Sequence, residues 1–324
     1  MTPRMPLVRI GLTLLLATAA PLRAQEGAGT SSAILLQLAP APRPLALGGA
    51  YAALARDPYA LFYNPSRLAG TARTFGAAYH AYPAGIAAGS AAAALPFGRF
   101  ALALGVHYLD LGEVEVLEPD PAYGGQRGRA TGEVVDGGEV LAAVGAAFAL
   151  APSLQVGAAA KALRLGLAGA SDHGFAADLG VSAVLFHGRL RLGTAVQNLG
   201  PEVGPGRAAP LPRTVRAGAA LELGGAAGLR TILAADAVHV EQRVSFAAGL
   251  ETGYRSGTGL GLVARAGFDG RARDGDAASP LTLGAGMVLG RLRLDYAYRG
   301  VGPLGATHHF GFSLHLDGEA EPAR

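Results

Sequence analysis

Hydrophobic residues alternate with small or polar residues along most of this chain. From Phe100 to Tyr108, large apolar or aromatic side chains fill the even positions, and Ala, Gly and His fill the odd ones. This period of two is typical of a strand with two different faces. About 14 such runs, each of roughly 9–12 residues, follow Thr71, and a strand of that length crosses a bilayer when it tilts by about 45°. The clearest later runs are Arg189–Asn198, Arg213–Leu223, Arg243–Tyr254, Arg291–Arg299 and Thr307–Leu316.

The loops that connect these runs, called joints below, alternate in length. Short joints such as Pro96–Arg99 and Gly290–Arg291 are followed by longer ones such as Asp110–Gly138 and Leu199–Pro212. Bacterial outer-membrane barrels have short periplasmic turns and longer outer loops, whereas a soluble all-β fold has no reason to separate them. Only a closed barrel pairs every backbone group of a strand in lipid. We therefore predict an all-β fold, a single-chain transmembrane antiparallel β-barrel of about 14 strands over residues 71–316.

Composition supports a membrane barrel and excludes other classes. Charged residues make up 16 % of the 324 residues, below the roughly 25 % of soluble domains. No stretch after the N-terminus reaches 18 apolar residues, which argues against helical membrane spans. The formal charge of +3 is small and dispersed, so we expect no nucleic-acid partner. With 6 % aromatic residues and no tryptophan, the aromatic girdle at the lipid interfaces would be thin, resting on Tyr79, Tyr82, Tyr108, Tyr254, Tyr296, Tyr298, Phe100, Phe246, Phe310 and Phe312.

The N-terminus has the pattern of a secretory signal peptide. Arg4 and Arg9 precede an apolar run, and Ala24 is a small residue at the expected cleavage point. We expect residues 1–24 to be removed and the mature protein to reach the cell outer membrane, with a polar C-terminal tail at 317–324. The chain has no cysteine, so neither a lipid anchor nor a disulfide is expected.

Residues 25–70 precede the barrel, and from Ser31 onward they break the strand pattern. Three prolines at 40, 42 and 44 predict an extended start, and Leu47–Arg56 has helical spacing. Asp57 followed by Pro58 predicts an N-cap and a short helical turn that ends before Asn64. This segment is either a periplasmic lead-in or a hatch folded into the barrel, where many small inward residues leave room for it.

Charged side chains occupy the face opposite the lipid. They either pair with one another across a polar lumen, which we expect, or form a selectivity lining. These lumen-facing residues are Lys161, Arg191, Arg216, Glu222, Asp236, Glu251, Arg293, Asp295 and Arg299.

Several motifs occur in the order found in one known family. They begin with a hatch motif that includes Gly48, Gly49, Asp57, Asn64 and Pro65. The later pieces are Tyr108–Glu113, Ala177–Gly180, Val196–Gly200 with Leu211 and Pro212, Leu294–Tyr298 and Leu304–Phe310. Together they resemble the PorV/PorQ family, a branch of the FadL-like barrels. The resemblance implies a 14-stranded barrel with an N-terminal hatch, and a role in type IX protein secretion, as a shuttle for cargo or as part of the surface-attachment complex.

No motif for catalysis or cofactor binding stands in the right context. The chain has no G-x-S-x-G or Walker-type loop, and Gly259–Ala264 matches a dinucleotide fingerprint only in letters, because strand residues follow it. His308 and His309 lie on opposite faces of one strand, so they do not chelate one metal ion. We therefore expect a non-enzymatic protein without cofactor or metal.

The sequence leaves two main functions open. The first is protein secretion or surface export, with outer-membrane lipid, secreted cargo proteins and secretion or attachment-complex components as partners. The alternative is a FadL-like passive channel for hydrophobic small molecules; a purely structural barrel is a third possibility. Inward positions that are mostly Gly, Ala or charged favour export, since a lipid channel should have apolar inward positions near the hatch. The acidic joint Asp110–Gly138 is the longest exposed surface for a partner.

Overall fold

The computed structural model describes residues 31–224, 228–256, 260–271 and 278–318. The predicted signal peptide, residues 25–30 and most of the predicted C-terminal tail lie outside these ranges. Among the described residues, no helix has both the length and the apolar character needed to cross a membrane.

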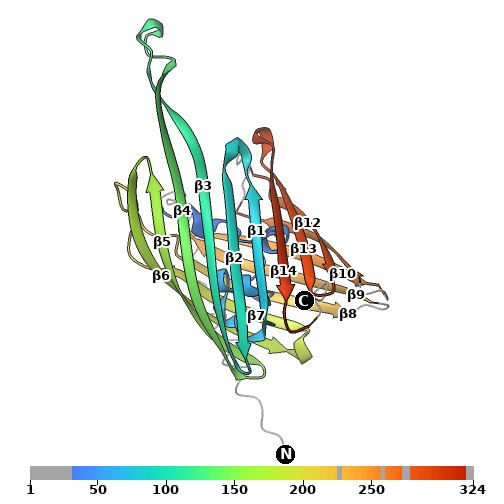
Figure 1. Ribbon diagram of the computed structural model, residues 1–324. Coiled ribbons are helices and arrows are strands. Elements are labelled where there is room, and N and C mark those ends of the chain that lie inside the picture. The colour runs from blue at the N-terminus through green and yellow to red at the C-terminus, as the bar shows by residue number, and fades with distance from the viewer. Residues whose placement is uncertain (1–30, 225–227, 257–259, 272–277, 319–324) are drawn as a thin grey trace, which may run out of the picture.

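The strands close into one antiparallel barrel in which each strand pairs with its neighbours in sequence (Figure 1). The first strand closes the ring by pairing with the last, from Thr74 opposite His315 to Ala81 opposite His308. The predicted 14-stranded transmembrane barrel is thus confirmed. Its strands are β1 (Thr74–Ala81), β2 (Ala87–Phe97), β3 (Phe100–Pro119), β4 (Gly128–Ala151), β5 (Leu154–Leu167), β6 (Ala170–Leu185), β7 (Leu190–Leu199), β8 (Thr214–Gly224), β9 (Leu229–Val240), β10 (Arg243–Arg255), β11 (Leu260–Asp269), β12 (Leu281–Leu289), β13 (Leu292–Gly300) and β14 (Ala306–His315).

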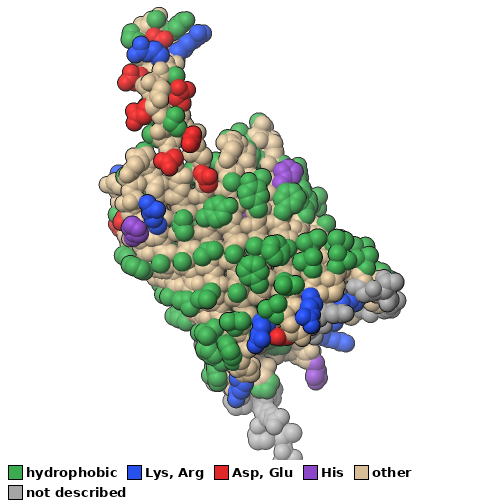
Figure 2. All heavy atoms as spheres, in the orientation of Figure 1, with side chains coloured by type: hydrophobic (Ala, Val, Ile, Leu, Met, Phe, Trp, Pro, Cys, Tyr) green, Lys and Arg blue, Asp and Glu red, His purple; other side chains and the backbone are tan. Residues whose placement is uncertain are grey.

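The period of two in the sequence becomes an outer and an inner face. In β3, residues alternate strictly between exposed and buried from Phe100 to Asp110. Figure 2 shows the apolar side chains spread over the barrel wall, as expected of a surface that faces lipid. Tyr82 was wrongly assigned to the aromatic girdle. It packs in an inner apolar cluster, and its ring lies edge-on to His309 at 5.4 Å.

β3 and β4 continue past the other strands as a two-stranded ribbon (Figure 1). The expected long loop at 110–138 is therefore mostly strand, and only the turn around η5 (Pro121–Tyr123) is irregular. The register shifts between Asp110 and Glu113, where Gly112 has a φ of 74°. This bulge lets β3 leave the barrel wall. Acidic side chains follow the ribbon, as Figure 2 shows. We call the end of the barrel with the ribbon the long-loop end and the opposite end the short-turn end.

Residues 31–70 run inside the barrel from one end toward the other. The Ser32 amide donates to the Pro210 carbonyl, in the long joint after β7, whereas Arg67 reaches Gln155 near the short-turn end. We call residues 31–38 the upper segment and residues 42–70 the hatch. They contain four short helices: η1 (Ile34–Gln37), α2 (Pro42–Ala46), η2 (Pro58–Phe62) and η3 (Pro65–Gly70). The remaining helices lie in joints: η4 (Pro83–Gly85), η6 (Phe186–Gly188) and η7 (Gly302–Leu304).

Two predictions about the start of the hatch are wrong. The expected helix over Leu47–Arg56 is absent, because Gly48 and Gly49 have φ of 64° and 87° and the chain after them forms turns. The proline-rich stretch is not fully extended either, since α2 begins at Pro42. Prolines are tolerated in a first helical turn, where the backbone amides have no partner within the helix.

The predicted cap at Asp57 is confirmed. Its Oδ1 accepts the Tyr59 amide at 3.0 Å, and η2 starts at Pro58 and ends at Phe62. Asn64 repeats the arrangement one turn later, where its Oδ1 accepts the Ser66 amide at 3.2 Å and η3 starts at Pro65. These two caps set the course of the hatch toward β1.

Candidate functional site

Glycines on the inner wall let the hatch approach the strands closely. A Cβ atom on Gly267 of β11 would lie 2.2 Å from the Gly48 nitrogen, and one on Gly180 of β6 would lie 2.0 Å from Asn64 Oδ1. Real side chains do not tolerate such distances. The small inward residues therefore provide the space that the hatch fills.

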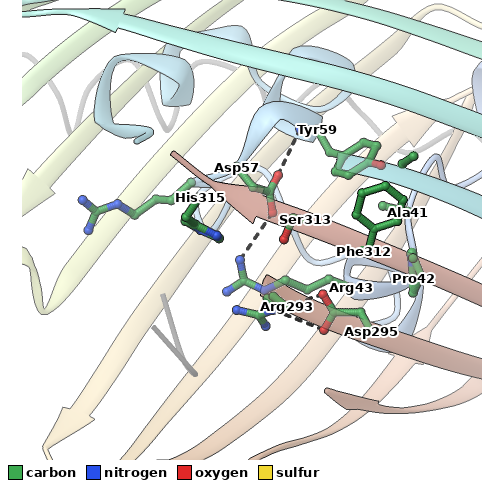
Figure 3. A pocket seen from close by; sticks show the side chains of 13 residues that line it. Ala41, Pro42, Arg43, Asp57, Tyr59, Arg293, Asp295, Phe312, Ser313 and His315 are labelled. Carbon is green, nitrogen blue, oxygen red and sulfur yellow. Dashed lines mark hydrogen bonds and ion pairs between the residues drawn. The ribbon is translucent and has the colours of Figure 1, made fainter. Parts of the chain in front are cut away.

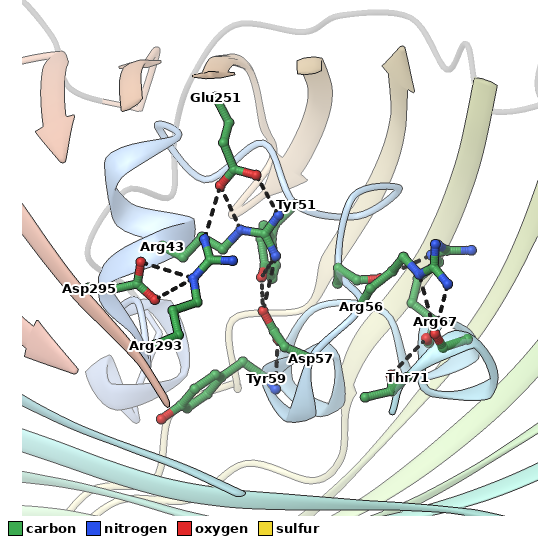
Figure 4. A network of polar contacts seen from close by, with 12 residues as sticks. Arg43, Tyr51, Arg56, Asp57, Tyr59, Arg67, Thr71, Glu251, Arg293 and Asp295 are labelled. Carbon is green, nitrogen blue, oxygen red and sulfur yellow. Dashed lines mark hydrogen bonds and ion pairs between the residues drawn. The ribbon is translucent and has the colours of Figure 1, made fainter. Parts of the chain in front are cut away.

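A buried ion network joins the hatch to the barrel wall (Figure 4). Arg43 of α2 donates to both carboxylate oxygens of Glu251 in β10, from Nε at 2.8 Å and from NH2 at 2.7 Å. On its other side, Arg43 lies 3.4 Å from Asp57 Oδ2, which also accepts the Tyr51 hydroxyl. Glu251 is fully buried, so this bidentate pair forms away from water, where ion pairs are least screened.

Barrel side chains complete the network. Arg265 Nε lies 2.6 Å from Glu251 Oε2, and its NH2 lies 2.8 Å from Asp295. Arg293 Nε pairs with Asp295 at 3.0 Å. The three arginines, counting Arg43, face three carboxylates, counting Asp57. The charges balance, which is the condition for keeping ions in a dry interior.

Further polar contacts hold the middle of the hatch. Asp236 of β9 accepts the backbone amides of Tyr51 and Ala52 at 3.0 and 2.9 Å. Arg216 of β8 donates to Gln197 at 2.8 Å and lies over the Tyr63 ring. Burial raises the pKa of Tyr63 to about 12. The hatch is thus bound to several strands of the barrel by buried hydrogen bonds, which depend on close contact and on the exclusion of water.

The end of the hatch is equally buried. Asn64 Nδ2 donates to the Ala52 carbonyl at 2.9 Å, and Arg67 donates to Gln155 at 2.9 Å and to the Ala55 carbonyl at 3.2 Å. Burial lowers the pKa of Arg67 to about 9, and the positive charges of Arg56 and Arg191 act in the same direction.

The other charged residues expected to face the lumen also have partners. Lys161 lies 2.6 Å from Asp178 and donates to Asn198 at 2.8 Å. Arg191 pairs with Glu222, and Arg299 lies 3.2 Å from Asp269. These side chains are therefore engaged with neighbouring strands and leave no row of free charges along an open pore.

A small cavity remains where the hatch meets β1, β13 and β14 (Figure 3). Arg43, Asp57, Tyr59, Arg293 and His315 are among its lining residues. Its volume of about 30 Å³ holds one or two water molecules. An organic solute does not fit there while the hatch is in place.

An apolar cluster fills the lumen at the long-loop end, and the upper segment is part of it. Leu35 is 1 % exposed and Ala33 is 2 % exposed. The barrel contributes large aliphatic side chains to this cluster, which we call the Leu35 cluster: Leu109 of β3, Leu141 of β4, Leu163 and Leu165 of β5, and Val203 and Leu211 of the joint after β7. Small-molecule sites are lined mainly by apolar side chains, and in this cluster a leucine of the same chain packs among them.

Hydrogen bonds, and no ion pairs, hold the upper segment. Glu139 of β4 accepts the Ile34 amide at 3.1 Å and the Leu35 amide at 2.8 Å. Near the mouth, Glu241 accepts hydrogen bonds from the Ser31 hydroxyl and the Gln37 side chain. Ser32 also donates to the Pro210 and Ala209 carbonyls, both at 3.0 Å, and Arg271 donates to the Gln37 carbonyl at 3.3 Å. Residues 31–38 include no charged side chain, so hydrogen bonds and the burial of Leu35 anchor them without an ion pair.

Sequence reasoning missed several of these residues. Arg43 and Glu251 are 208 positions apart, so no local pattern links them. Arg265 follows the same alternation as the predicted inward charges and was detectable in that way. The interpretation that inward positions are mainly small or charged is wrong at the long-loop end, where leucines face inward. Glu139 directly follows the predicted loop and carries no signal of its own.

Comparison with solved structures supports the fold described above. No protein-family model and no curated protein matches the chain. Among solved structures, the chain is similar to the toluene transporter TbuX of Ralstonia pickettii, with 14 % identity, a TM-score of 0.59, and coverage of 85 % of this chain and 98 % of that one. It is also similar to the Pseudomonas putida toluene transporter TodX, with 11 % identity, a TM-score of 0.57, and coverage of 92 % and 100 %. A Pseudomonas aeruginosa FadL homologue matches with 12 % identity, a TM-score of 0.51, and coverage of 84 % and 97 %.

The chain has the FadL-like barrel fold. At these identities the likeness extends to the fold alone, and the PorV/PorQ resemblance stays a prediction. These neighbours are transporters and a FadL homologue rather than enzymes.

Proposed function

We propose that this protein is a passive, non-enzymatic outer-membrane channel for hydrophobic small molecules, with the long-loop end outside the cell. The single observation that carries the proposal is the Leu35 cluster. It is an apolar site inside the barrel, and the side chain that fills it comes from a segment without charged side chains, which is held by no ion pair. An apolar molecule that enters this site replaces Leu35 without exposing the leucines of the wall to water.

The similar structures support the same function. Two of them are named as toluene transporters, and a third solved structure with this fold, CymD, is named a monoaromatic hydrocarbon channel at a TM-score of 0.57 and 12 % identity. Small apolar solutes such as toluene match a site lined by five leucines and a valine. The alternative that the sequence left open is therefore the better-supported one.

Uptake of naphthalene, a neutral fluorescent probe, tests the proposal. Gram-negative cells that produce the protein should accumulate naphthalene several times faster than cells with an empty vector. Leu163→Gln, which places an amide in the Leu35 cluster, should remove most of the gain. Leu117→Gln is the matched control, because Leu117 is 60 % exposed on the ribbon. Equal uptake with and without the protein, at equal amounts of folded barrel, would contradict the proposal.

Protein export is a second candidate, and the ribbon is the observation that favours it. The ribbon projects from the barrel into water with exposed Val114, Leu117 and Val134 and several carboxylates. Such a surface suits a partner such as a cargo protein or an attachment-complex component. Quantitative mass spectrometry of a deletion strain separates the candidates. Export predicts that surface proteins with a shared C-terminal sorting domain accumulate in the periplasm, and the channel predicts an unchanged set of surface proteins.

A further inference from the structure

Glu139 is a carboxylate placed inside the Leu35 cluster. It lies directly across from Leu109 on β3 and from Leu165 on β5. It is 9 % exposed. A carboxylate with leucines on both sides is a costly arrangement, because burial removes the water that would otherwise solvate it.

The upper segment supplies the hydrogen bonds that offset this cost. The amides of Ile34 and Leu35 donate to the two carboxylate oxygens, one to each. In the part of the chain that the structure describes, no lysine or arginine forms an ion pair with Glu139. Of the basic groups toward this end, Lys161 pairs with Asp178 and Arg271 pairs with Asp269. Glu139 therefore depends on donors that leave when the upper segment leaves.

A substrate that displaces the upper segment must replace two interactions, one apolar and one polar. It must fill the apolar space of Leu35, and it must donate hydrogen bonds to Glu139. A plain hydrocarbon meets the first requirement only and leaves a buried carboxylate without a partner. A carboxylate-bearing substrate adds a second negative charge beside the first.

The geometry points to an amphiphilic amine as the preferred substrate, an apolar body with a protonated amino group that donates to Glu139. A protonated amine supplies both the hydrogen bonds that Glu139 loses with the two amides and a charge opposite to that of its carboxylate. This assignment rests on the proposed function, since it names the substrate class of the same apolar site.

Three probes with one ring system test the inference. They are naphthalene, 1-naphthylmethylamine and 1-naphthylacetate, which are neutral, cationic and anionic at pH 7. Equilibrium dialysis of each radiolabelled probe against the full chain in neutral detergent, corrected for empty micelles, gives the affinities. The wild type should bind the amine at least tenfold more tightly than naphthalene, and the acetate more weakly than both.

Glu139→Gln should bring the ratio of amine to naphthalene affinity close to one. The ratio is the readout because a loosened upper segment raises all affinities alike and cancels in it. Glu118→Gln, on the exposed ribbon, should leave the ratio unchanged within twofold. If naphthalene binds and the amine gains nothing, or if Glu139→Gln keeps the preference, the inference is overturned while the channel stands. If none of the probes binds the folded wild type, both fail.

Discussion

The upper segment and the hatch share one lumen but are held by different forces. The hatch is tied to the wall by buried ion pairs around Glu251 and by carboxylate contacts to its backbone. The upper segment has no charged side chain. It is held by the burial of Leu35, by two amides on Glu139 and by hydrogen bonds near the mouth of the barrel. Separating ions in a dry interior is costly, whereas one apolar group can be exchanged for another at little cost.

This difference indicates which part of the lumen moves during transport. Full burial of a leucine stabilises by about 1.5–3 kcal/mol, an amount that a small apolar ligand can replace. Loss of one partner from a buried ion network costs about 3–5 kcal/mol, which no apolar ligand replaces. We therefore expect the upper segment to yield to substrate and the hatch to stay in place.

The largest effect should come from Glu251→Gln. This change leaves Arg43, Arg265 and Arg293 buried around a neutral amide, so the free energy of unfolding should fall by about 3–5 kcal/mol. Urea unfolding in detergent, followed by circular dichroism, measures the loss. Glu118→Gln breaks only the exposed pair with Arg129 and should cost less than about 0.5 kcal/mol. Equal losses in the two variants would remove the ion network as the anchor of the hatch.

A smaller effect should distinguish two adjacent glycines. Gly48→Ala forces a side chain onto a φ of 64° and to 2.3 Å from the Phe268 carbonyl oxygen, whereas Gly49→Ala is strained in φ alone, with its nearest contact at 3.6 Å. We expect a loss of about 1 kcal/mol for Gly49→Ala and at least twice that for Gly48→Ala in the same unfolding assay. Similar losses would mean that the hatch does not press against β11 at this point.

Leu35→Asp should change the free energy of ligand binding rather than that of unfolding. The new carboxylate disfavours docking of the upper segment, because the cluster is apolar and because Glu139 carries a negative charge beside it. Naphthalene should therefore bind at least tenfold more tightly, which is a gain of about 1.4 kcal/mol in the free energy of binding. Equilibrium dialysis measures the gain. Ile34→Asp is the matched control, because Ile34 is 52 % exposed, and it should change the affinity less than threefold. A gain in both variants, or in neither, would argue against Leu35 as the plug of the site.

The barrel was predictable because each strand's two faces are recorded in the alternation of neighbouring residues. Alternation along each strand reflects lipid on one side and lumen on the other, and it survives in the sequence from Thr74 to His315. The caps at Asp57 and Asn64 are local too, since each side chain contacts an amide two residues later. The ribbon was read as a loop because its strands face water on both sides and lack the two-faced pattern.

The contents of the lumen were not predictable in the same way. The helical spacing of Leu47–Arg56 was misleading, because the left-handed backbone at Gly48 follows from contact with β11, which no local pattern records. The partners of Glu251 come from three distant parts of the chain. The Leu35 cluster likewise joins the upper segment to five strands, β2 to β6, and to the joint after β7, so its apolar character emerges only in three dimensions.

Hydrogen–deuterium exchange of the full chain with and without naphthalene compares the two regions most directly. Saturating naphthalene should speed the exchange of the Ile34 and Leu35 amides, which now donate to Glu139. The Tyr51 and Ala52 amides, held by Asp236, should remain protected to the same degree. Faster exchange in the hatch with no change at Ile34 and Leu35 would contradict an exchangeable upper segment above a fixed hatch.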